Sequence, residues 1–504
     1  MKKIFLILIV LADIALSTSL PTQAKKNNNK NDDSVIAKVG SIKITVNEFV
    51  YGYEYGPAFY KRTNNSKRIF LENLIREKLL ASDGYFRSLD TTSNVKEYFN
   101  ALRDDLATEE LFKDEIQSKI AFTQEEIDTV AKQKLLDVEI QWLYSPDEKE
   151  IVEIQDSLSR GADFQTLFDS QLNDTISVDD RSLKSSRFHV EMKNPQLGKV
   201  VDKLETGKYS IPIKTNDGWY IVRLRNLSYD LILSETEQNK VLDEARRAVI
   251  KKRMDLLSDK YVNELMLVQN PVIKRNPFQI LRSYLADYEL SKEKYSEWKL
   301  DEILNNVLKE YEPFYQNDYS KIVLVELKDY NITLNDFLIW YRTRDQYVKF
   351  DKRSFAKYSR SLEQIVWRMI RDKILCNVAE TKGFYKNKIV NDQSKWWLDK
   401  ILYAEIKNEM INMIILEKKE INTKENDNIS QSEYIEDELT KKLFYKLNEL
   451  KNKYPVVINE KLLNEIKVSD EENIKAIDLF IVKRGGLLPR TPYPTIDNYW
   501  ARWQ

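Results

Sequence analysis

The chain has 504 residues, with 79 basic and 80 acidic side chains and a formal net charge of -1. This balance creates no global field that would attract nucleic acid or an anionic membrane, so a partner must be recognised by shape and local contacts. The single histidine, His189, and the single cysteine, Cys376, exclude a disulfide framework, a Cys/His zinc site and any mechanism that needs two imidazoles. With 42% apolar residues the chain can build real cores, and its length corresponds to about three domains.

Residues 1–24 have the pattern of a secretion signal. Lys2 and Lys3 form a charged start, Ile4 to Leu11 form an apolar run, and Ala24 is a small residue suited to cleavage. The pattern predicts an exported, periplasmic chain that is cut after Ala24. An uncleaved anchor is the alternative, although the apolar run is shorter than the roughly 20 residues that span a bilayer.

Residues 25–34 are polar and of low complexity, which predicts a solvated leader. A helical module is predicted at 35–130, and it opens with a strand-turn-strand pattern. Thr45 and Glu48 then have the spacing of a capping box at the start of a helix, and the segment 123–126 repeats this cap chemistry.

A compact α+β unit is predicted at 131–228. Its first strand begins at Leu136 and alternates apolar with polar residues, as a half-buried strand would. A helix stops at Gly161, where glycine easily adopts a left-handed cap. Further along, Asn216-Asp217-Gly218 has the turn chemistry of a β-hairpin. The apolar positions of the first strand are Val138, Ile140, Trp142 and Tyr144.

An internal repeat relates two distant parts of the chain. ITVNEFV at 44–50 recurs as ITLNDFL at 332–338, and LIREKLL at 74–80 recurs as MIRDKIL at 369–375. Two matches in the same order and with similar spacing predict that residues 321–417 form a second copy of the first helical module.

The remaining segments connect or follow these modules. Residues 229–320 are predicted to be a helical connector, whose long first helix is capped by Ser234. Residues 418–433 read as a polar linker, and 434–504 as a helical and extended tail with a proline-rich aromatic end.

The chain resembles the SurA and PrsA group of exported parvulin-type chaperones over roughly residues 35–266, and more loosely from 321. The resemblance rests on VIAKVGSIKITVNEF, on SLSRGADFQTLF and on TGKYSIPIKTNDGWYIVRL. It implies a mainly α fold with an inserted α+β parvulin-like domain. The family positions that are matched in this domain are Gly161, Asp163, Phe164, Gly207, Ser210, Pro212, Thr215 and Gly218.

The same resemblance implies a degenerate catalytic site. The family's two histidines correspond to Gln141 and Tyr220, and its glycine-rich stretch corresponds to RSLKSSRF at 181–188. We therefore expect no catalytic residue, and whether the chain is an enzyme stays open. The groove that remains would bind substrate through Gln141, Trp142, Tyr144, Phe188, Leu197, Trp219 and Tyr220. The alternative is that Trp142 and Trp219 are ordinary core aromatics.

These features predict an ATP-independent holdase for unfolded envelope or outer-membrane proteins, with no cofactor, metal or nucleic acid. A nucleotide is not expected either, since Gly207-Lys208-Tyr209 lacks the rest of a phosphate loop. Weak multivalent contacts with an unfolded chain can give affinity without a covalent step. Two alternatives remain: an active prolyl isomerase, and an envelope scaffold that docks one partner through Trp500 and Trp503.

Overall fold

The computed structural model describes residues 33–231, 234–315, 318–421, 431–469 and 491–503. The predicted signal peptide at 1–24 and nearly all of the leader at 25–34 lie outside the described residues. The chain divides into two compact units. The helical unit comprises Met1–Ser118 and Leu257–Gln504, and the sheet unit comprises Lys119–Leu256.

The helical unit contains two three-stranded antiparallel sheets, with strand orders β10-β1-β2 and β7-β8-β9. The first sheet consists of β1 (Val35–Val39), β2 (Ile42–Thr45) and β10 (Val456–Ile458). The second consists of β7 (Val272–Ile273), β8 (Val323–Glu326) and β9 (Asn331–Thr333). In each sheet a hairpin runs directly into a nine-residue helix whose N-cap is a threonine, Thr45 in one and Thr333 in the other.

The α-helices described in this unit fall into two groups. Those of the first module and its partners are α1 (Val46–Glu54), α2 (Ser66–Phe86), α3 (Ser93–Glu115), α15 (Lys388–Ile421), α16 (Gln431–Lys453) and α17 (Glu460–Glu465). Those near the second sheet are α10 (Arg275–Glu289), α11 (Lys292–Glu297), α12 (Leu300–Tyr315), α13 (Leu334–Arg342) and α14 (Phe355–Thr381). Within the described ranges, none of the helices carries the uninterrupted apolar stretch that a bilayer crossing requires.

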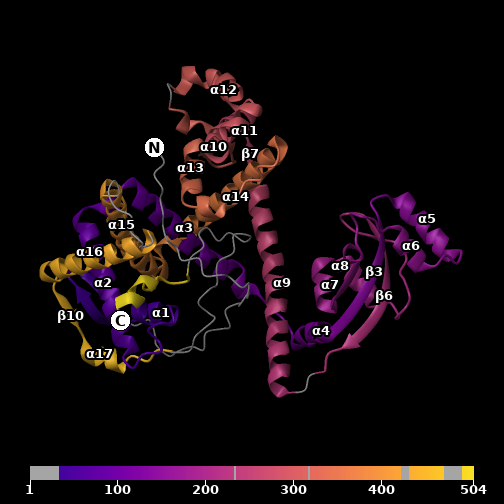
Figure 1. The fold of residues 1–504 in the computed structure, drawn as a ribbon, viewed down its shortest axis with the longest axis horizontal. Helices are drawn as coiled ribbons and strands as arrows, with labels where there is room; N and C mark the ends of the chain where they lie inside the picture. Colours follow the sequence, from indigo (N-terminus) through magenta and orange to yellow (C-terminus); the bar gives the residue numbers. More distant parts are fainter. Residues whose placement is uncertain (1–32, 232–233, 316–317, 422–430, 470–490, 504) are drawn as a thin grey trace. The chain divides into compact units, whose positions relative to one another are not determined.

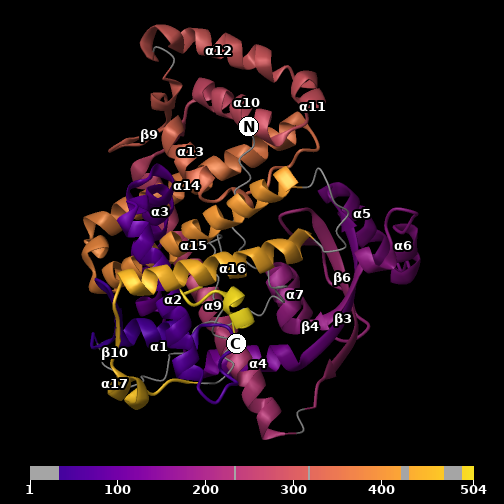
Figure 2. The same ribbon diagram turned by 60° about the vertical axis from the view of Figure 1, so that its left-hand side comes forward.

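The segment expected to be a tail packs into the first module. The strand β10 pairs with β1, so that Ala37 lies opposite Ile458. Helix α16 lies along α15 and α2 (Figure 2), and Trp500 is fully buried in the same core as Phe49 and Leu79. The polar stretch predicted as a linker is narrower than 418–433, because α15 continues to Ile421 and α16 begins at Gln431.

The sheet unit is built around one antiparallel sheet with strand order β4-β3-β6-β5. Its strands are β3 (Leu136–Ser145), β4 (Ser182–Ser186), β5 (Ile213–Lys214) and β6 (Trp219–Tyr229). Its helices are α4 (Gln124–Leu135), α5 (Glu148–Ser159), α6 (Phe164–Ser170), α7 (Arg187–Lys193), α8 (Pro195–Val201) and the first part of α9 (Glu235–Gln269). The predicted caps form: Thr123 and Glu126 make a complete capping box, and Gly161 has φ +97°.

Both faces of this sheet are covered, so the prediction of a half-buried first strand is wrong. Figure 1 shows α7 and α8 on one side of β3 and β6, and α5 and α6 on the other. Val138 and Ile140 pack with α7 and α8, whereas Leu143 packs with the two helices opposite. The polar-looking side of β3 is buried as well, since Gln141 is 3% exposed. A local alternation cannot reveal this, because it does not show which helices return to the second face.

Candidate functional site

Three aromatic side chains share one face of the sheet unit. Residues two apart on a strand point to the same side, so Trp142 and Tyr144 of β3 lie together. The pairing of Tyr144 with Tyr220 brings the β6 tyrosine onto that same side. The Tyr220 ring centroid lies 5.1 Å from that of Tyr144, nearly edge to face, and 6.4 Å from that of Trp142. We call Trp142, Tyr144 and Tyr220 the aromatic face.

The hairpin turn between β5 and β6 fixes the polar edge of the aromatic face. The Tyr220 hydroxyl donates to Asp217 Oδ2 at 2.7 Å, and the Tyr144 hydroxyl donates to the Asp217 carbonyl oxygen at 2.6 Å. Thr215 Oγ1 donates to Asp217 Oδ1 at 2.5 Å and so holds the turn closed. Both tyrosine hydroxyls are thereby committed as donors to a single residue.

The electrostatics of this edge keep Tyr220 protonated. Burial, together with the hydrogen bond and the negative charge of Asp217, raises the pKa of the Tyr220 phenol. The hydrogen bonds from Thr215 and Tyr220 lower the pKa of the Asp217 carboxyl. At neutral pH the Asp217 carboxyl is therefore ionised and the Tyr220 phenol is neutral. The oxygens of this pair can accept hydrogen bonds from a peptide, but the single phenol proton is already donated to Asp217.

Two further polar side chains border the aromatic face. The Arg181 guanidinium lies 4.9 Å from the Tyr144 ring centroid, in a cation–π arrangement. Beyond the end of β4, the Gln171 side chain bonds both the amide and the carbonyl of Tyr144, each at 3.0 Å. Strand β4 does not reach Tyr144, and the Gln171 side chain makes the two backbone hydrogen bonds that a neighbouring strand would make there. It thereby fixes the end of β3.

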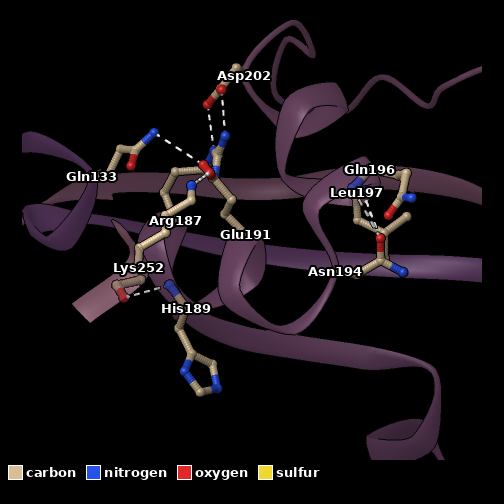
Figure 3. A network of polar contacts seen from close by, with 10 residues as sticks. Gln133, Arg187, His189, Glu191, Asn194, Gln196, Leu197, Asp202 and Lys252 are labelled. Atoms are coloured by element: carbon tan, nitrogen blue, oxygen red, sulfur yellow. Dashed lines mark hydrogen bonds and ion pairs between the residues drawn. The ribbon is translucent and has the colours of Figure 1, made fainter. Parts of the chain in front are cut away.

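An ion-pair network holds the short helices α7 and α8 over the sheet. The Arg187 guanidinium is 1% exposed and binds the Asp202 carboxylate through two bonds of 2.5 Å. Its third contact is Glu191 Oε2 at 3.1 Å, and Glu191 Oε1 in turn binds Lys252 Nζ of α9 at 3.0 Å. Figure 3 shows the Asp202 carboxylate facing this guanidinium, while the His189 ring points away from the network.

The structure brings together only some of the residues predicted to line one groove. Trp142, Tyr144 and Tyr220 form the aromatic face, and Leu197 lies in the core beneath α8 on the same side. Phe188 is half-buried, with Lys134 Nζ 5.0 Å from its ring centroid.

Gln141 and Trp219 lie on the opposite face of the sheet. Gln141 pairs with Arg223, and Trp219 packs with the core beneath α5 and α6. Gln141 is thus not on the side of the sheet that carries Tyr220, where the β3 residues are Trp142 and Tyr144. His189 is exposed.

Sequence reasoning missed Arg181, Gln171 and the role of Asp217. The turn sequence around Asp217 was recognised, and its closeness to Tyr220 could have suggested the hydroxyl–carboxylate pair. Nothing local indicates that Gln171 reaches a strand 27 residues away. In the part of the chain that the structure describes, no cluster of three His, Cys, Asp or Glu side chains is placed to hold a metal ion.

Replacing Gly218 by alanine is expected to distort the aromatic face and to destabilise the sheet unit by about 2 kcal/mol. Gly218 has φ +152°, and a Cβ there would lie 2.6 Å from Tyr144 Cε2. Hydrogen exchange of peptides from β3 and β6 measures the loss. Gly207→Ala is the matched control, because Gly207 has φ +86° and no atom within 4 Å of an added Cβ. Equal losses in both variants would show that contact with Tyr144 is unimportant.

Comparison with known proteins identifies foldases. No family model matches the chain. It is 26% identical over 157 residues to the foldase protein PrsA 2 of Bacillus cereus, which covers 28% of this chain and 52% of that protein. It is 22% identical over 254 residues to the foldase protein PrsA of Oceanobacillus iheyensis, which covers 48% of this chain and 84% of that protein. The chain thus spans about half the length of the first relative.

Solved structures of the same kind overlap with the chain. Peptidylprolyl isomerase PrsA from Bacillus anthracis is 18% identical, with 38% of this chain and 96% of that chain covered and a TM-score of 0.23. A SurA-like chaperone from Campylobacter jejuni is also 18% identical, with 45% and 98% covered and a TM-score of 0.17. At these TM-scores the solved structures support no inference about function.

Proposed function

Because the chain belongs to the SurA/PrsA-type parvulin family, we propose that it is an ATP-independent chaperone for unfolded polypeptides. The sheet unit is then a parvulin-like domain, inserted between helical parts, that has lost prolyl isomerase activity. The aromatic face is the observation that carries this proposal. It offers ring surfaces with fixed polar edges, which suit an extended peptide. Neither Gln141 nor Tyr220, at the two positions that correspond to the family's histidines, supplies an imidazole.

The proposed loss of activity follows from what these side chains can do. An isomerase lowers a barrier of roughly 18–20 kcal/mol by binding the twisted amide in a shaped pocket. Tyr220 is held by Asp217, and Arg181 lies against Tyr144, so neither is poised to share a proton with the amide. The only histidine, His189, is exposed on α7 and is not part of the aromatic face.

The helical unit is proposed to provide most of the client contacts, through two related modules. The two hairpins share a register shift near the start of the first strand, at Val35 and at Val323, and each leads into a threonine-capped helix. Exposed large apolar side chains on helices of this unit give many weak sites. They include Tyr284, Tyr288, Phe314, Met413, Leu416, Phe444 and Tyr445.

The location and the partners follow from the same proposal. We place the protein outside the cytoplasm, in the periplasm, where ATP is absent and unfolded envelope proteins arrive in extended form. The scaffold alternative finds less support, because Trp500 is buried and bonded to Glu77 within the helical unit and so is not free to dock a partner.

Two assays on the purified chain test the proposal. Aggregation of several unrelated unfolded proteins is expected to be suppressed without ATP, and isomerisation of a proline peptide is expected to proceed at the uncatalysed rate. Acceleration that disappears in a Tyr220→Phe variant would contradict the loss of activity. Suppression limited to one client would favour a dedicated scaffold instead. Gly207→Ala, which leaves the aromatic face intact, is the control variant in both assays.

A further inference from the structure

Residues 491–503 lie on the helical unit as an extended peptide would. Residues 491–497 form neither helix nor strand, and a 3-10 helix follows at Asn498–Trp503. Pro492 and Pro494 flank Tyr493, and since proline restricts φ to about -65°, they favour an extended course. We call residues 491–503 the PYP segment, and the surface of α1, α2 and α15 beneath it the PYP groove.

The first half of the PYP segment is recognised by α1 and the turn that follows. The Tyr493 ring stacks on Tyr51, with centroids 4.2 Å apart and planes 10° apart. Thr495 Oγ1 donates to the Gly52 carbonyl oxygen at 2.7 Å. A Cβ on Gly52 would lie 3.2 Å from the Pro494 carbonyl oxygen, so the absence of a side chain lets the two backbones approach.

The second half is held by a charged pair and a buried indole. Asp497 Oδ2 accepts from Lys407 Nζ at 2.6 Å and from the Tyr403 hydroxyl at 2.9 Å. Trp500 is fully buried and its indole N–H donates to Glu77 Oε1 at 2.9 Å. The Asp497 amide donates to the same Glu77 oxygen at 2.8 Å. The Glu77 carboxylate therefore accepts hydrogen bonds from both the backbone and the tryptophan side chain of the PYP segment.

The core beneath the PYP segment is built mostly by other elements. Of the 26 buried residues that the described part of the chain contributes to this core, Ile496 and Trp500 belong to the segment, and its partly buried Tyr499 and Trp503 pack against the same core. Its bonds to the rest of the unit use side chains and single backbone groups, and the described part of the segment joins no sheet. Most of the remaining core residues come from strands β1 and β2 and helices α1, α2, α15 and α16, with Leu463 from α17.

We propose that the PYP groove is a peptide-binding site and that the PYP segment is its ligand, bound in cis. The ligand class is an extended Pro-Tyr-Pro peptide that carries an acidic residue four positions after the tyrosine and a tryptophan seven positions after it. The acidic residue is needed because Lys407 lies at that point of the groove. This peptide binding does not rest on the proposed function.

Peptide exchange on the cleaved full chain tests this proposal. A specific protease site is placed between residues 470 and 490, the chain is cut, and a fluorescent peptide of residues 491–503 is added. We expect saturable binding by anisotropy, competition by the unlabelled peptide, and an unchanged circular dichroism spectrum. A Trp500→Ala peptide is expected to bind at least tenfold more weakly. Absence of exchange, equal binding of a scrambled peptide, or unfolding once the peptide leaves would overturn the proposal.

A charge-pair cycle locates the binding in the groove. Lys407→Met in the chain and Asp497→Asn in the peptide should each weaken binding, and together they should weaken it by less than the product of the two effects. If the two substitutions together weakened binding by the full product of their single effects, Lys407 and Asp497 would not interact and the peptide would be bound outside the PYP groove. Aggregation suppression measured on the same cleaved chain is a separate readout: failure there alone contradicts the proposed chaperone function and leaves peptide binding in place.

Discussion

Replacing Lys78 by methionine is expected to destabilise the helical unit by about 3–5 kcal/mol. Lys78 is 2% exposed and lies between two buried carboxylates, those of Glu48 and Asp399. The bond to Asp399 Oδ2 is 2.6 Å long. Removal of the ammonium group leaves two acidic groups without their shared cation in a place that water does not reach, and this uncompensated charge is the main cost.

Hydrogen exchange of peptides from α2 and α15 measures this loss locally, without interference from the sheet unit. Lys441→Met is the matched control, because the Lys441 side chain is 65% exposed and its partner Glu438 lies one helical turn away. Such surface pairs contribute at most about 1 kcal/mol. If the two variants lost equal stability, the buried position of Lys78 would have no energetic role.

The stability of the helical unit is expected to fall by about 3 kcal/mol as the pH rises from about 4.5 to about 7. Burial raises the pKa of Glu48 from 4.5 to about 7; the charge of Lys78 opposes this shift, whereas Asp399 and Glu77 add to it. In this window the folded chain binds a proton that the unfolded chain does not. Stability from this group is therefore complete below pH 4.5 and is lost as the pH passes the folded pKa.

A Glu48→Gln variant isolates this contribution. Glutamine cannot titrate, so the stability of the variant should stay nearly constant between pH 4.5 and 7, while that of the original chain declines. Denaturant unfolding, followed by hydrogen exchange in α2, measures how the free energy of unfolding changes with pH. Asp497 acts in the opposite direction and at lower pH, since its pKa is lowered to about 2 despite burial, because Lys400 and Lys407 stabilise its charge. If the free energy of unfolding fell equally with pH in the Glu48→Gln variant and in the original chain, the assignment to Glu48 would be contradicted.

Local chemistry made part of the fold predictable. The turn at 216–218 forms the β5–β6 hairpin, and Gly161 ends α5 in a left-handed conformation. Thr123 builds its complete capping box. At Thr45 only half of the predicted box forms: Thr45 Oγ1 accepts the Glu48 amide at 3.2 Å, but the Glu48 carboxylate turns to Lys78 instead. A buried cation attracts that carboxylate more strongly than a backbone amide does.

The candidate site was predictable in its residue types more than in its geometry. Trp142, Tyr144 and Tyr220 were recognised from alternation and resemblance, and they do share a face. Gln141 was placed with them, although a strand turns neighbouring side chains to opposite sides. The register shift between Glu139 and Ile140 further changes which β6 residue each position meets. Such a shift depends on the partner strand and leaves no trace in the β3 sequence.

The sequence by itself determined the chemistry that this protein can use: a balanced charge, one imidazole, aromatic strands and a family resemblance. Only the tertiary structure decided that Val456–Ile458 pairs with β1, that Lys78 meets Asp399, and that Trp500 meets Glu77. These partners are separated by more than 300 residues. Caps and turns are set by interactions within a few residues, whereas sheet edges and buried charges gain their partners only when distant segments pack together.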